Sequence, residues 1–136
     1  MAMFRKDFQD LALVRAREAE ALLAAGLFDG AYYMAGLAVE CALKACIARA
    51  TRRYEFPDQT RTRTSYIHDL DKLLQAAGLS DTLRRADPIV LRDWGKVSAW
   101  QIETRYRLGV SEADATEFVR VIADRQGILA WLTQYW

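Results

Sequence analysis

Apolar residues recur along most of the chain at intervals of three and four positions, the period of an amphipathic helix. This period predicts helices over residues 6–25, 29–52, 68–78, 81–86, from Asp87–Pro88 to about 100, and 111–136. The segments 54–67 and 101–110 lack the period and are predicted loops. We therefore expect an all-α fold: a single domain over residues 1–136, built as an up-and-down bundle of four main helices plus one short helix.

The second predicted helix is apolar on almost every side. Between Gly30 and Ala48 its formal charges are Glu40 and Lys44, four residues apart, which places both side chains on one face. Since an unpaired buried charge is costly, Glu40 should also meet a partner from another helix. The candidates for that partner are Arg15, Arg105 and Tyr106. We interpret Glu40 and Lys44 as a structural ion pair, with a nucleotide-binding role as the alternative.

The same helix is nearly as long as a membrane span, but its two central charges disfavour insertion by about 2.5–3.5 kcal/mol each. The first ten residues contain no long apolar segment and no cleavage site of a signal peptide. A cytoplasmic protein without membrane contact is therefore expected. The net charge of +1 does not single out a nucleic-acid binder, although most of the 19 basic residues are arginines, which suit phosphate or carboxylate groups.

The two cysteines lie on this helix as well. Cys41 and Cys46 point about 140° apart on a helix, so they cannot form a disulfide with each other. Neither has a neighbouring histidine or second cysteine at the spacing of a zinc site. We interpret both as small core residues and expect no metal and no cofactor.

Several segments taken together resemble a known family. The end of the first helix contributes Ala19, Leu22, Leu23 and Gly26. The second helix contributes Tyr33 and the run Ala-Gly-Leu-Ala-Val-Glu-Cys-Ala-Leu-Lys-Ala over residues 35–45. Further matches are His68, Asp69, Leu70 and Leu73, followed by Arg105 and Tyr106. In this order, and over most of the chain, these residues resemble the HEPN domain of prokaryotes and higher eukaryotes.

The resemblance implies a helical bundle that forms a homodimer. It also implies genetic pairing with a minimal nucleotidyltransferase as partner, a role in a toxin–antitoxin or defence system, and, in many members, ribonuclease activity without a metal ion. Members that cleave RNA carry an arginine, four to six intervening residues and a histidine. In those members the residues from both chains meet in one cleft.

The chain has this spacing, because four residues separate Arg63 from His68 and six separate Arg61 from it. An imidazole can take the proton of a ribose 2′-hydroxyl, and a guanidinium can hold the scissile phosphate. Arg63 and His68 are thus the catalytic candidates, and Arg61, Arg105 and Tyr106 are candidates for RNA or nucleotide binding. In cleaving members the motif lies at a later helix. Alternatively, His68 packs or caps the first turn of its helix and Arg63 is a solvated loop residue.

Two functions from different classes therefore remain open. One is a dimeric domain that binds RNA or a nucleotide, with ribonuclease activity as its chemistry. The other is a non-catalytic interaction module for a partner nucleotidyltransferase. A third hypothesis is a ligand pocket inside the bundle, lined by Tyr32, Tyr33 and Trp94. The aromatic segment 131–136 is expected to contact a second copy of the chain, with packing onto the bundle as the alternative.

Overall fold

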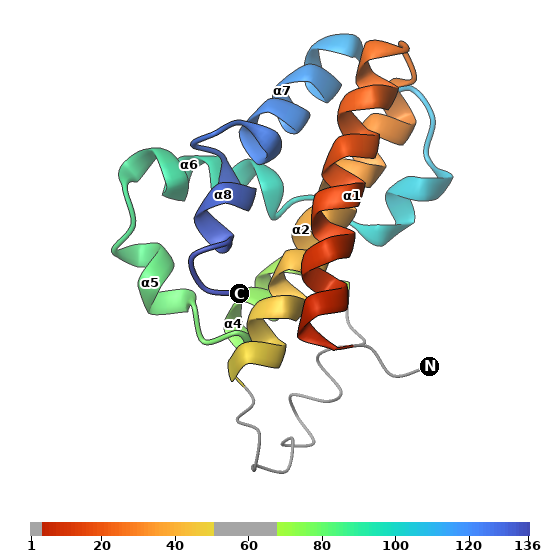
Figure 1. Ribbon diagram of the computed structural model, residues 1–136. Helices are drawn as coiled ribbons and strands as arrows, with labels where there is room; N and C mark the ends of the chain where they lie inside the picture. Colours follow the sequence, from red (N-terminus) through yellow and green to blue (C-terminus); the bar gives the residue numbers. More distant parts are fainter. Residues whose placement is uncertain (1–3, 51–67) are drawn as a thin grey trace.

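Helices make up the regular structure of the protein, as the computed structural model in Figure 1 shows. The structure describes residues 4–50 and 68–136, and these residues contain no strand. The helices are α1 (Arg5–Ala24), α2 (Phe28–Ala50), α4 (Leu70–Ala76), α5 (Ser80–Arg84), α6 (Pro88–Val97), the 3-10 helix η1 (Ile102–Tyr106), α7 (Glu112–Ala123) and α8 (Ile128–Leu132). The predicted all-α fold is confirmed.

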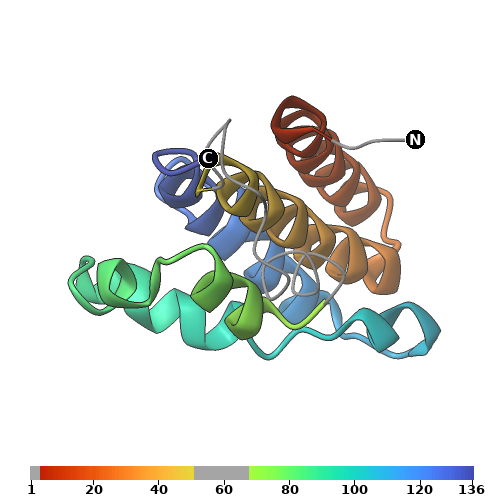
Figure 2. The ribbon, with the colours of Figure 1, turned by 90° about the horizontal axis from the view of Figure 1, so that it is seen from below.

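Helix α2 is the centre of the fold. It contacts α1, α4, α7, α8 and η1, and in Figure 2 it lies between α1 and α4. A short turn joins α1 to α2, in which Gly26 has a φ of +76°, a conformation that favours glycine. The amide of Leu27 donates to the carbonyl of Leu22 at 2.9 Å, which closes the end of α1. As the short link predicts, the two helices run antiparallel (Figure 1).

The apolar character of α2 follows from this central position. By length and composition alone, this helix of 23 residues could cross a membrane. However, 67% of its most apolar 18-residue stretch is buried inside the bundle. Side chains that face neighbouring helices are not available to lipid, so α2 is the core helix of a helical bundle.

A glycine in α2 allows an unusually close contact. A Cβ atom placed on Gly36 would lie 2.2 Å from Cε2 and Nε1 of Trp100, a residue just beyond the end of α6. Trp100 is 1% exposed, and its ring stacks on Tyr33 with 6.0 Å between the centroids. Its indole Nε1 is buried and has no hydrogen-bond partner among the described residues. The indole therefore fills the space that a side chain at position 36 would need.

The prediction of one continuous helix over residues 111–136 is wrong, because the chain turns between α7 and α8. Gly127 lies in this turn, and a Cβ atom there would come within 2.8 Å of the carbonyl oxygens of Val121 and Ile122. The amide of Gly127 donates to the carbonyl of Asp124 at 2.9 Å. This tight return over the last turn of α7 directs α8 back onto the core.

The aromatic segment 131–136 packs onto the bundle, which was the alternative to a contact with a second copy. Trp131 is 8% exposed and meets Tyr135 edge to face, with 5.4 Å between the ring centroids. Tyr135 and Trp136 are partly buried against the same core. The end of the chain therefore belongs to the bundle's own packing.

The segment 101–110 contains η1, although the sequence predicts only a loop there. Thr104 is buried, and its hydroxyl donates to the carbonyl of Gln101 at 2.5 Å. After η1, the amide of Val110 donates to Oδ1 of Asp29 at 2.8 Å, which ties this segment to the start of α2. Ser111 then caps α7 by accepting from the amide of Asp114, as its sequence pattern predicts.

Both cysteines are free and buried, in agreement with their interpretation as core residues. Burial raises the pKa of Cys41 to about 11 and that of Cys46 to about 12. In mildly alkaline buffer, therefore, neither thiol forms much of the reactive thiolate. We expect DTNB to modify the folded protein no faster than it unfolds, and to modify both thiols at once in denaturant. Rapid labelling of either cysteine in native buffer would contradict this prediction.

Candidate functional site

The residues best suited to catalysis lie where the start of α4 meets the middle of α2. His68 directly precedes Asp69, the residue that caps α4 by accepting from the amide of Lys72 at 3.0 Å. The Nδ1 atom of His68 lies 2.8 Å from Oε1 of Glu40. Glu40 is 4% exposed, whereas the His68 side chain is 46% exposed. A buried carboxylate thus holds an imidazole that reaches solvent.

The second oxygen of this carboxylate has a different partner. Lys44 Nζ lies 3.2 Å from Glu40 Oε2, and the Lys44 side chain is 12% exposed. Each carboxylate oxygen therefore meets one nitrogen, one from its own helix and one from the start of α4. This arrangement offsets the cost of burying Glu40, since both oxygens keep a polar partner.

The prediction that Glu40 meets Arg15, Arg105 or Tyr106 is wrong. Arg15 instead forms an ion pair with Glu18, one turn further along α1. The guanidinium carbon of Arg105 lies over the ring of Tyr106, 4.8 Å from its centroid. His68, rather than Arg15, Arg105 or Tyr106, is the partner of Glu40 from outside α2.

The contact with Glu40 also assigns the protons of His68. An ionised carboxylate only accepts hydrogen bonds, so beside ionised Glu40 we assign the proton to Nδ1 and, in the neutral ring, the free lone pair to Nε2. Nε2 has no hydrogen-bond partner among residues 4–50 and 68–136. An imidazole fixed in this way can accept a proton at Nε2 and return it.

His68 lines a cleft of about 410 Å³ between the start of α4 and the segment that follows α6. The lining residues are His68, Asp69, Ser98, Ala99, Trp100, Gln101, Ile102 and Glu103. In the part of the chain that the structure describes, neither lysine nor arginine lines it. The candidates Arg61 and Arg63 lie outside the described residues. A cation that binds a phosphate in this cleft would have to come from outside the described residues or from a second copy of the chain.

The candidates Arg105 and Tyr106 lie on η1 and do not line the cleft of His68. Both are exposed, Tyr106 to 76%, so Tyr106 does not pack onto the bundle. Their cation–π contact keeps a guanidinium and an aromatic ring together on the surface. The structure thus brings His68, Glu40 and Lys44 together and keeps this exposed pair separate from them.

The third hypothesis, one pocket lined by three aromatic residues, is wrong. Tyr33 stacks on Trp100, and Trp94 donates its indole proton to Oδ1 of Asp71 at 2.8 Å. Tyr32 lines a different cleft from the one at His68. Across residues 4–50 and 68–136, no group of three His, Cys, Asp or Glu side chains is placed to hold a metal ion.

A family model described as the HEPN domain matches residues 8–135 of the chain. The chain belongs to the HEPN domain family. The match extends from α1 to beyond α8 and includes both the contact of His68 with Glu40 and the exposed pair on η1. The resemblance inferred from the sequence is thereby confirmed. Neither the curated proteins nor the solved structures yield a match.

The sequence analysis of this HEPN domain missed the contact between His68 and Glu40. A signal for it was present, because His68 is the single histidine of the chain and directly precedes the cap residue Asp69. A polar side chain at the start of a helix can reach across to a neighbouring helix. The partners predicted for Glu40 were instead Arg15, Arg105 and Tyr106, and His68 was assigned to catalysis or to its own helix.

Proposed function

We propose that this HEPN domain is a cytoplasmic homodimer that binds RNA or a nucleotide and cleaves RNA without a metal ion, as part of a toxin–antitoxin or defence system. The observation that carries the proposal is the environment of His68. Its Nδ1 lies 2.8 Å from a buried carboxylate, its side chain is 46% exposed, and it lines a cleft. The family of the chain supports this class of function, because ribonucleases are frequent in it.

In the proposed reaction, Nε2 of His68 accepts the proton of a ribose 2′-hydroxyl. The 2′ oxygen then forms a bond to the adjacent phosphorus, and the bond from phosphorus to the 5′ oxygen breaks. The imidazolium returns its proton to the leaving 5′ oxygen, so the products are a cyclic phosphate and a 5′-hydroxyl. Glu40 stabilises the imidazolium through Nδ1, which lowers the barrier to the first transfer.

Charge develops on the phosphate during this reaction and requires a cation. We assign that role to Arg63, with Arg61 as a further contact to the RNA backbone, from either copy of the chain. Arg105 and Tyr106 are assigned to substrate binding outside the reacting centre. Tyr106 can stack on a base, and Arg105 can meet a phosphate, since both side chains are exposed.

The experiment that tests the proposal compares RNA cleavage by the wild type and by His68→Ala, in the presence of a chelator. We expect the rate to fall about a hundredfold or more, because the reaction loses its proton acceptor. Gln75→Ala is the matched control, since Gln75 is an exposed residue of α4, the helix that His68 precedes. Thermal melting shows whether both variants are folded. Equal cleavage by the wild type and a folded His68→Ala variant would remove His68 from the mechanism.

The second candidate function is a non-catalytic module that binds a minimal nucleotidyltransferase. Exposed large apolar side chains on α1 and α6 favour it, because such residues suit contact with another protein. They are Leu13 and Val14 on α1, and Ile89 and Leu91 on α6. Under this function the wild type shows no cleavage above the His68→Ala background, while both proteins co-purify with the partner.

A further inference from the structure

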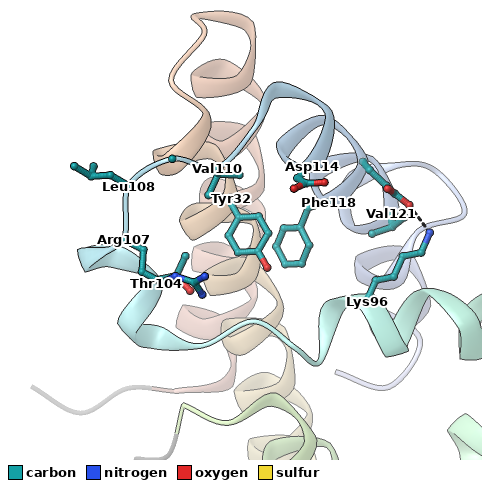
Figure 3. A pocket seen from close by; sticks show the side chains of 11 residues that line it. Tyr32, Lys96, Thr104, Arg107, Leu108, Val110, Asp114, Phe118 and Val121 are labelled. Carbon is teal, nitrogen blue, oxygen red and sulfur yellow. Dashed lines mark hydrogen bonds and ion pairs between the residues drawn. The ribbon is translucent and has the colours of Figure 1, made fainter.

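A second cleft, of about 420 Å³, lies between α2, α6, α7 and the segment after η1, and His68 does not line it. Figure 3 shows Tyr32 and Phe118 side by side in this cleft, and their rings stack with 4.1 Å between the centroids. Arg107 lies on one side of the two rings and Lys96 on the other, with Asp114 above them in this view. Val121 adds to the apolar wall. The cleft therefore combines an aromatic floor with charged edges.

One wall of this cleft is fixed in place without any ligand. The segment 107–110 is tied to the start of α2, because the amide of Val110 donates to Asp29 Oδ1 at 2.8 Å. Gly109 has a φ of +97°, a conformation that favours glycine, and it allows the turn into α7. A wall that is already ordered loses little conformational freedom when a ligand binds.

The polar groups of the cleft fall into two kinds. Lys96 and Glu117 form an ion pair with each other, and this lysine lowers the pKa of Glu117. Arg107 and the carboxylate of Asp114 form no ion pair with the described part of the chain, and no hydrogen bond to the hydroxyl of Tyr32 is found there. The cleft thus offers one unneutralised cation, one unneutralised anion and a phenol.

The charges of Arg107 and Asp114 both act on the hydroxyl of Tyr32. Burial raises the pKa of the Tyr32 hydroxyl, while Arg107 opposes this shift and Asp114 adds to it. Both charged groups line the same cleft as this phenol (Figure 3). A ligand beside Tyr32 would meet a positive group on one side and a negative group on the other.

We propose that this cleft binds a small zwitterion with a large apolar group, the chemistry of a free amino acid with an aromatic or branched side chain. The ligand's carboxylate pairs with Arg107 and accepts from the Tyr32 hydroxyl, and its ammonium pairs with Asp114. The apolar group lies against Phe118 and Val121. A phosphate dianion fits less well, because the unneutralised carboxylate of Asp114 lines the same space. The proposal does not depend on RNA cleavage.

The test is an amide NMR titration of the full chain with three probes that differ in charge. L-phenylalanine carries both charges, phenylpropionate lacks the ammonium, and phenethylamine lacks the carboxylate. We expect L-phenylalanine to shift the resonances of residues 107–114 and to bind about tenfold more tightly than either other probe. Chemical shifts that are indistinguishable among the three probes, or no shift at millimolar L-phenylalanine, would overturn the proposal.

Two variants test whether Arg107 and Asp114 bind the two charged groups of the ligand. Arg107→Gln should weaken L-phenylalanine binding about tenfold and leave phenethylamine binding unchanged, and Asp114→Asn should weaken L-phenylalanine binding and leave phenylpropionate binding unchanged. Arg125→Gln is the matched control, since Arg125 is exposed and does not line the cleft. Arg107 and Asp114 are themselves exposed, so the variants should fold, which thermal melting checks. Binding that survives both substitutions, or full competition by inorganic phosphate, would overturn the proposal.

Discussion

Gly36→Ala is expected to destabilise the folded protein by about 3 kcal/mol. The added Cβ would lie 2.2 Å from two atoms of the Trp100 indole, far inside contact distance. Trp100 is 1% exposed and stacks on Tyr33, so moving the indole to make room for the Cβ would disrupt this packing. Either the ring leaves its site or α2 shifts away from the segment after α6. Urea unfolding, followed by tryptophan fluorescence, measures the loss.

Gly95→Ala is the matched control for this variant. Gly95 also lies in a helix, α6, but a Cβ there would meet nothing within 4 Å. Because alanine is the better helix former, this control should gain about 0.5–1 kcal/mol. The double variant Gly36→Ala with Trp100→Leu should lose less than the sum of the single losses, since the smaller side chain leaves room for the Cβ. Equal unfolding free energies for Gly36→Ala and Gly95→Ala would contradict the proposed role of Gly36.

The contrast between these two glycines shows where prediction from the sequence ends. The period of apolar residues predicts α2 and its central position, because that information is local. The contact of Gly36 with Trp100 joins two segments that lie far apart in the chain. The period of apolar residues does not show that Gly36 must remain a glycine and Gly95 need not, although Gly36 belongs to the run that resembles the family. Packing between distant segments supplies that difference.

The turn between α7 and α8 was not predicted, for a different reason. Apolar residues keep the helical period on both sides of it, so the pattern favours one long helix. Gly127 interrupts that helix, because its backbone approaches the carbonyl groups at the end of α7. These carbonyl groups belong to Val121 and Ile122, only a few residues before Gly127, so the signal for this turn is local.

The candidate site was predictable in part. The four-residue spacing predicts that Glu40 and Lys44 share a face of α2, and they lie within 3.2 Å of each other. The third member, His68, meets Glu40 through packing of α4 on α2, which the sequence does not specify. Several polar side chains could have reached Glu40, so residue type alone could not choose among them.

Glu40→Ala is the second substitution with a large expected effect, a loss of about 3–5 kcal/mol of stability. Lys44 is only 12% exposed, and its ammonium lies 3.2 Å from the Glu40 carboxylate. Removing that carboxylate leaves the buried ammonium unpaired. The loss of the Glu40 side chain also leaves a cavity beside the core, which adds to the cost. Urea unfolding of the variant and the wild type measures the difference.

The double variant Glu40→Met with Lys44→Met separates stability from chemistry. Replacing a buried ion pair by apolar groups of similar size is often neutral, so this variant should recover most of the stability that Glu40→Ala loses. Its cleft still contains His68, but Nδ1 no longer has its carboxylate partner. The ring can then turn, and either nitrogen can carry the proton.

If His68 is the proton acceptor and Glu40 positions it, RNA cleavage by this folded double variant should fall at least about tenfold. Lys44→Met alone is the matched control, because it keeps the contact between Glu40 and His68 and should retain cleavage. A double variant that is stable and as active as the wild type would show that Glu40 supports only the fold. A loss confined to variants without the carboxylate would show that one buried group serves both the packing of α2 and the orientation of His68.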